Sequence, residues 1–161
     1  MNTDVTRYNQ KDLAIMKQFD SLSDMQCHRL KLIKDLALGL EYKSIGLANC
    51  VMFTRETKAI EQYLSKDFTV YKVNCKHNRL TRKALFNNHD TSIICNPAGQ
   101  AAFLNAHKTE MNISIGLCVG HDMIFCHQSH APVTTIFTKD FTNNNDPSMA
   151  IHDIRKSCHN D

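Results

Sequence analysis

Four cysteines in the middle of this chain each end a short apolar run, and thiols in such positions can bind metals or attack electrophiles. They are Cys50, Cys75, Cys95 and Cys118. Successive members are 25, 20 and 23 residues apart, which is the length of a compact strand–helix unit. Because the carboxyl ends of parallel strands share one edge of a sheet, we expect these four thiols to lie along the same edge.

The segment after each of these cysteines has the pattern of a helix, whose positive N-terminal end favours thiolate over thiol. Several thiolates left together would repel each other, and a Zn²⁺ ion or an iron–sulfur cluster would neutralise them. The sequence therefore predicts that Cys50, Cys75, Cys95 and Cys118 bind zinc or an iron–sulfur cluster. In the alternative interpretation they are small buried hydrophobic residues, and the protein is a small-molecule or partner-binding module with structural cysteines.

A second alternative is a thiol-dependent enzyme that uses one cysteine of low pKa, either Cys118 or Cys95. Three residues after Cys118, at the start of a predicted helix, His121 could assist by carrying a proton. The imidazole of His121 could equally bind a metal or cap the helix. In the same way Lys76, directly after Cys75, could lower the pKa of that thiol.

Small and capping residues at two predicted helix starts are candidates for binding a cofactor. They are Asn96, Gly99 and Gly120. Residues of this kind let a ligand approach the backbone closely, although they serve equally well in plain helix starts. A further pair, Cys126 and His130, has the spacing of one helix face, but no third ligand accompanies it.

Strand-like and helix-like segments alternate along most of the chain. We predict strands at residues 44–50, 68–75, 91–95, 111–118 and 132–138, and helices at 24–42, 54–66, 98–107, 120–129 and 147–156. Thr54 and Asn96 are the expected caps of two of these helices, and Pro97 suits a first helical position. The alternation predicts an α/β fold with an open, doubly wound, mainly parallel sheet of about five strands and flanking helices, which is Rossmann-like. We expect one domain over residues 1–161, in which N-terminal helices in 1–40 pack on a strand–helix core in 41–156.

The composition excludes several classes of function. A net charge of +3 without a block of lysine and arginine argues against nucleic-acid binding. No stretch approaches the roughly 20 apolar residues of a membrane span, and the polar start lacks a secretory signal. We therefore expect a cytoplasmic protein, in which seven cysteines are reduced and serve as ligands or reactive groups rather than disulfides.

The sequence resembles a family of uncharacterised, predicted metal-binding proteins, domain of unknown function family eighteen forty-seven. The matching stretches are 45–50, 75–76, 95–101, 104–105, 112–122, 131–135, 139–140 and 146–147. The resemblance implies that Cys50, Cys75, Cys95 and Cys118 occupy the cysteine positions of the family, with His121 inside its best-marked motif. It implies no reaction. Members usually begin with a cysteine-rich segment, and residues 1–24 here contain no cysteine, so the resemblance does not extend to that segment.

Overall fold

The structure is a computed structural model that describes residues 3–22 and 26–157. Its backbone contacts divide the chain into two compact units, residues 1–43 and 44–161. The strands and all the predicted site residues belong to the second unit. That residues 1–40 pack on the core stays a prediction.

The first unit contains the 3₁₀ helix η1 (Thr3–Arg7) and the helices α1 (Gln10–Asp20) and α2 (Arg29–Gly39). Helix α1 begins with a capping box, because the Asn9 side chain accepts a hydrogen bond from the Asp12 amide and the Asp12 carboxylate accepts one from the Asn9 amide. The helix predicted at 24–42 is confirmed over a shorter range, and the His28 side chain caps its start by accepting a hydrogen bond from the Lys31 amide.

The second unit is built on a sheet of four parallel strands in the order β2-β1-β3-β4. The strands are β1 (Ser44–Asn49), β2 (Thr69–Asn74), β3 (Met111–Ile115) and β4 (Val133–Phe137). The helical segments are η2 (Val51–Phe53), α3 (Thr54–Leu64), η3 (His77–Arg79), α4 (Arg82–Phe86), α5 (Pro97–Ala106), α6 (Val119–Gln128) and α7 (Pro147–Ser157). The predicted α/β class with a parallel, doubly wound sheet is confirmed.

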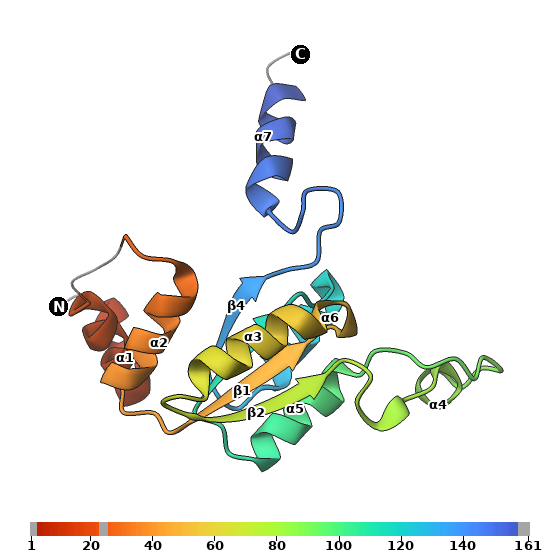
Figure 1. Cartoon of the computed structure of the whole chain (residues 1–161), viewed down its shortest axis with the longest axis horizontal. Helices are drawn as coiled ribbons and strands as arrows, with labels where there is room; N and C mark the ends of the chain where they lie inside the picture. Colours follow the sequence, from red (N-terminus) through yellow and green to blue (C-terminus); the bar gives the residue numbers. More distant parts are fainter. Residues whose placement is uncertain (1–2, 23–25, 158–161) are drawn as a thin grey trace. The chain divides into compact units, whose positions relative to one another are not determined.

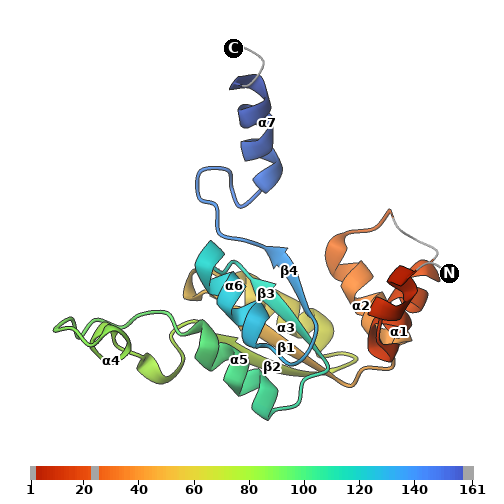
Figure 2. The ribbon, with the colours of Figure 1, turned by 180° about the vertical axis from the view of Figure 1, so that it is seen from behind.

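Helix α3 covers one face of the sheet, and α5 and α6 lie side by side on the other (Figures 1 and 2). Apolar side chains from both faces fill the space between the layers, and those that are almost completely buried include Ile45, Leu47, Leu64, Leu104, Ile113, Ile115, Leu117 and Phe125. Burial of the central strands on both faces explains why their sequences are apolar along nearly their whole length.

The predicted strand at residues 91–95 is wrong, and the described part of the second unit has four strands where about five were expected. This segment makes one isolated antiparallel bridge, between Ile93 and Thr81. Its backbone is bonded instead to the loop before it, since the Arg82 amide donates to Ser92 O and the Ile94 amide donates to Leu80 O. With its first two residues exposed, the segment also lacks the burial on both faces that an inner parallel strand requires.

The two predicted helix caps had different outcomes. Asn96 caps α5 as predicted, because its side chain accepts a hydrogen bond from the Gly99 amide, and Pro97 is the first helical residue. Thr54 does not cap α3 but is its first residue. Its hydroxyl donates to Val51 O, in the 3₁₀ turn that precedes the helix, and the residue in the cap position is Phe53, whose side chain makes no capping bond.

Candidate thiol site at the carboxyl edge of the sheet

The order of the strands brings the predicted cysteines to one edge. Cys50 directly follows β1 and Cys75 directly follows β2, and these two strands are paired in register up to Asn49 and Asn74. Cys118 follows β3 after two further residues. The strand order reverses between β1 and β3, and ligands of open α/β sheets bind beyond the carboxyl ends at such a point. Cys50 and Cys118 therefore flank the place where this fold most readily forms a site.

The side chains also point to the same side of the sheet. A Cβ added to Gly46 would meet Leu104 of α5, so alternation along β1 directs Cys50 toward the layer of α5 and α6. Cys75 is the register partner that follows on β2 and points the same way. Cys95 and Cys118 precede α5 and α6 themselves, and Cys118 is the residue before the first turn of α6. Cys95 and Cys118 thus lie where the two helices of this layer begin, whereas Cys50 precedes η2 and α3.

The thiols lie close enough to influence one another or a shared lysine. The charges of Cys50 and Cys95 raise the pKa of Cys75. Lys139 Nζ lies 3.0 Å from Cys50 Sγ, and Cys118 is near enough to raise the pKa of Lys139. Cys50 and Cys75 are 4% and 1% exposed, whereas Cys95 and Cys118 are half-buried, so Cys95 and Cys118 are the more accessible thiols.

The thiols of Cys50 and Cys75 differ in their pKa values. Burial raises the pKa of Cys50, but hydrogen bonds from Lys139 and the Met52 amide, the charge of Lys139 and the contact with Cys75 together lower it below its usual value. Burial raises the pKa of Cys75 to about 12, and the charges of Cys50 and Cys95 add to this. Cys50 therefore ionises first, and Cys75 stays a thiol beside it. The pKa of Cys75 is raised and not lowered as predicted, because burial outweighs any effect of Lys76, whose ammonium donates to Ile93 O at 3.0 Å.

Lys139 belongs to the thiol site, although the sequence did not predict it there. It lies two residues after β4, at the same edge as the thiols. Although burial lowers the pKa of its ammonium group, the hydrogen bonds and charges of Cys50 and Cys118 raise it above the usual value. The available signal was its position, since Lys139 follows a parallel strand just as Cys50 and Cys75 do.

His121 is half-buried in the first turn of α6. Its pKa is lowered mainly by burial and further by the positive charges of Lys139 and Lys76, so the imidazole is neutral near pH 7. A neutral imidazole could accept a proton or bind a metal. Whether Cys118 and His121 act together in a reaction stays a prediction.

Helix capping explains the positions of Asn96 and Gly99, two of the three residues that were predicted to bind a cofactor. The Asn96 side chain occupies the space over Gly99, where an added Cβ would lie 2.3 Å from Asn96 Nδ2. Asn96 Nδ2 also donates to His77 O. Gly120 is in open space, with nothing within 4 Å of an added Cβ. Close approach at Gly99 is thus explained by the cap, and the assignment of all three residues to a cofactor stays a prediction.

Two buried amide side chains support the strand ends from which the thiols project. Gln100 in α5 donates through Nε2 to Asn49 O and Val73 O, near the ends of β1 and β2. Asn49 donates through Nδ2 to Cys50 O. These bonds fix the orientation of both amides, and their oxygens, Asn49 Oδ1 and Gln100 Oε1, are buried without a donor among the described residues. A buried acceptor of this kind needs a proton donor such as water.

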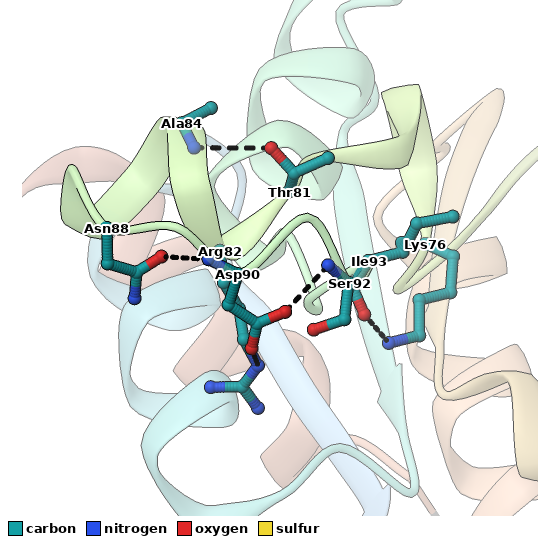
Figure 3. A network of polar contacts seen from close by, with 8 residues as sticks. All are labelled: Lys76, Thr81, Arg82, Ala84, Asn88, Asp90, Ser92 and Ile93. Atoms are coloured by element: carbon teal, nitrogen blue, oxygen red, sulfur yellow. Dashed lines mark hydrogen bonds and ion pairs between the residues drawn. The ribbon is translucent and has the colours of Figure 1, made fainter.

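The loop between Cys75 and Cys95 is held together at its base (Figure 3). Asp90 accepts a hydrogen bond from the Ser92 amide and faces Arg82, while the Lys76 ammonium reaches the backbone of Ile93. Beyond the loop, the Asn96 amide donates to Cys75 O at 2.8 Å. The loop therefore returns the chain to Cys75 although no strand carries Cys95 to the edge.

Within residues 3–22 and 26–157, no three histidine, cysteine, aspartate or glutamate side chains are arranged so that they could hold one metal ion. The separate pair Cys126 and His130 does not share a helix face, because α6 ends at Gln128. Both residues of that pair are exposed.

Comparison with known proteins identifies relatives but no reaction. The family model described as "Protein of unknown function (DUF1847)" matches residues 2–136. An uncharacterized protein of Methanocaldococcus jannaschii, MJ0455, is 35% identical over 148 residues, covering 89% of this chain and 77% of the relative. No solved structure matches. In the part of the chain that the structure describes, no helix is both long and apolar enough to cross a bilayer.

Proposed function

This chain belongs to the DUF1847 family, whose function is unknown, and we propose that it is a cytoplasmic protein that binds a thiophilic metal centre through Cys50, Cys75, Cys95 and Cys118. The metal centre is zinc or an iron–sulfur cluster. The observation that carries the proposal is the position of these cysteines at the carboxyl edge of the sheet, where Lys139 Nζ lies 3.0 Å from Cys50 Sγ.

The donor set suits such a metal in kind. Four sulfur ligands and no carboxylate are typical of structural zinc sites and of iron–sulfur clusters. The thiols of Cys50 and Cys75 are buried. Exclusion of water is one of the factors that tune the properties of a metal centre. Gln100 and the helix starts of α5 and α6 fix the backbone at the cysteines, which is the kind of support that metal ligands receive from neighbouring groups.

The present positions of the side chains suit a metal centre less well, and they show which side chains must move when a metal binds. Because no three metal-ligating side chains among the described residues are placed to hold one ion, the thiols must move toward one another before four sulfurs can surround one centre. The Lys139 ammonium must also leave the space between Cys50 and Cys118. In the metal-free protein this lysine offsets the charge of a thiolate, and a bound cation would take over that role.

Metal analysis of protein expressed without oxygen tests the proposal. We expect iron with sulfide, or zinc, in a fixed ratio to the chain, and visible absorption separates a cluster from colourless zinc. Replacing all four cysteines by serine should abolish binding, whereas Cys126→Ser, at an exposed cysteine outside the set, should leave it intact. A folded wild-type chain that stays metal-free after anaerobic reconstitution, or a quadruple variant that retains its metal, would refute the proposal.

A further inference from the structure

The loop that joins β2 to α5, residues 76–95, carries as much net positive charge as the whole chain. It contains one acidic residue, Asp90, and four basic residues, which are Lys76, Arg79, Arg82 and Lys83. Four positive charges and one negative charge give this basic loop a net charge of +3, and the whole chain also has +3. Basic and acidic residues therefore balance in the rest of the chain, and the basic loop is the segment whose charge attracts an anionic partner.

The tip of the basic loop exposes two large apolar side chains that follow one another in the sequence. Leu85 and Phe86 are the last two residues of α4, and they are 51% and 55% exposed. Every residue from 82 to 92 is exposed. Asn87, with φ 52°, has the left-handed conformation that ends the helix directly after this pair. Because water solvates neither side chain well, a surface that covers both of them would gain free energy.

Polar contacts join the two sides of the basic loop and support its tip (Figure 3). The Arg82 amide donates to Ser92 O at 2.9 Å, and the Lys83 amide donates to Asp90 O at 2.6 Å. The Asp90 carboxylate accepts a hydrogen bond from the Ser92 amide at 2.8 Å and also faces Arg82. The apolar pair lies beyond the last of these bonds. It is therefore held out on an ordered support, so that little conformational freedom has to be lost when it binds.

Basic side chains accompany the apolar pair. Lys83 lies in the same helix, Arg79 lies in the turn before it, and both residues are exposed. At an anionic bilayer, apolar side chains enter the boundary between headgroups and acyl chains while lysine and arginine stay among the headgroups. A bilayer needs no complementary groove. A protein partner would need about 800 Å² on each side for an interface of standard size, which is far more than two side chains provide.

We propose that the basic loop attaches this protein to an anionic lipid surface. Leu85 and Phe86 enter the bilayer boundary, and Arg79 and Lys83 face the headgroups. The attachment is peripheral and reversible, because it combines a small apolar anchor with a few charges. Each basic residue near such a surface strengthens binding about fivefold. This activity goes beyond metal binding and does not depend on it, since none of these residues is a thiol.

Flotation of the full chain with lipid vesicles tests the proposal. The probes are vesicles of phosphatidylcholine and phosphatidylserine in a ratio of about 7 to 3, and vesicles of phosphatidylcholine alone. We expect at least tenfold stronger binding to the mixed vesicles than to the neutral ones, and weaker binding at higher salt because the attraction is partly electrostatic. Metal content is measured separately on the same protein, so failure of lipid binding and failure of the metal site are distinguishable.

Replacing the apolar pair separates insertion from attraction by charge alone. Leu85→Ser combined with Phe86→Ser should lower the partition coefficient on the mixed vesicles at least tenfold, because the apolar area that enters the bilayer is lost. Both residues are exposed, so the fold does not depend on them. The matched control is Met149→Ser combined with Ile151→Ser, at two exposed apolar residues of α7, which should leave binding unchanged.

Two further variants test the charge and the position of the tip. Lys83→Gln should lower the partition coefficient about fivefold, whereas Lys58→Gln, at an exposed position of α3, should change it little. The chain has no tryptophan, so Phe86→Trp introduces a single fluorescent reporter. Its emission should shift to shorter wavelength when mixed vesicles are added, and Phe141→Trp, at an exposed residue outside the basic loop, should show no such shift.

Three results would overturn the proposal. The first is a wild-type chain that does not float with the mixed vesicles. The second is undiminished binding by the double variant of Leu85 and Phe86, since the lipid would then be bound elsewhere or by charge alone. The third is a loss in the α7 control as large as the loss in that double variant.

Discussion

Removing the charge of Lys139 should shift the ionisation of Cys50, and the size of the effect follows from one distance. Lys139 Nζ lies 3.0 Å from Cys50 Sγ. Even with the dielectric constant of water, two unit charges at this distance attract by about 1.4 kcal/mol, which is about tenfold in an equilibrium constant. Because Cys50 is buried while Lys139 is half-exposed, we expect an effect of this order.

The sign follows from the state that Lys139 stabilises. The ammonium favours the thiolate of Cys50 and so lowers the pKa of this thiol. Lys139→Met keeps a side chain of similar length without the charge, so the pKa of Cys50 should rise. At a given pH below that pKa, the ratio of thiolate to thiol should then fall about tenfold or more. Lys139→Arg, which keeps the charge, should change it much less.

Ultraviolet absorbance of the thiolate, followed against pH in the metal-free protein, measures this ratio without requiring access to the buried sulfur. Subtracting the curve of the same protein with Cys50→Ser isolates the contribution of Cys50. Lys58→Met, at an exposed position of α3, controls for the general loss of a positive charge. If Lys139→Met and Lys58→Met give the same titration of Cys50, the contact does not control the ionisation of the thiol and the reasoning is wrong.

Three further predictions concern the backbone that carries the site. Gly116 has φ +62°, and an added Cβ would lie 2.1 Å from the Phe53 ring, so Gly116→Ala should lower the free energy of unfolding by about 2–4 kcal/mol in a denaturant titration. Gly120→Ala, in open space in the first turn of α6, should instead leave stability unchanged or raise it by up to about 1 kcal/mol in the same titration. Asn112 is fully buried and donates to Ser129 Oγ at 2.7 Å, so Asn112→Ala should cost about 2–4 kcal/mol. A neutral Asn112→Ala, or equal effects at both glycines, would contradict these assignments.

Those parts of the fold that depend on local pattern and on burial could be predicted from the sequence. The runs that form the inner strands β1 and β3 are largely buried because they lie between helical layers, and the class of fold followed from the alternation of all four strands with helices. The shared edge of Cys50, Cys75 and Cys118 followed from the direction of parallel strands, although the order of the strands did not. Order depends on which side of the sheet each crossover takes, and a short apolar run carries no information about that.

What the sequence did not reveal has a common physical cause. The segment that ends at Cys95 has the composition of a strand, but the backbone of residues 80–82 satisfies its hydrogen bonds, and that pairing depends on a loop without a regular pattern. Lys139 looks like any solvated lysine after a strand, and only its position across the edge from Cys50 makes it part of the site. Both are contacts between residues far apart in the sequence or in irregular structure, where spacing rules have little to say.

The arrangement of charge along the edge bears on the proposed metal site. If all the thiols ionised together, their mutual repulsion would destabilise the metal-free fold, and a protein of this kind would fold only with its metal. Here Lys139 offsets one thiolate, at Cys50, and burial keeps Cys75 protonated beside it. The metal-free edge is therefore compatible with a folded protein, in which the thiols can receive a metal after folding.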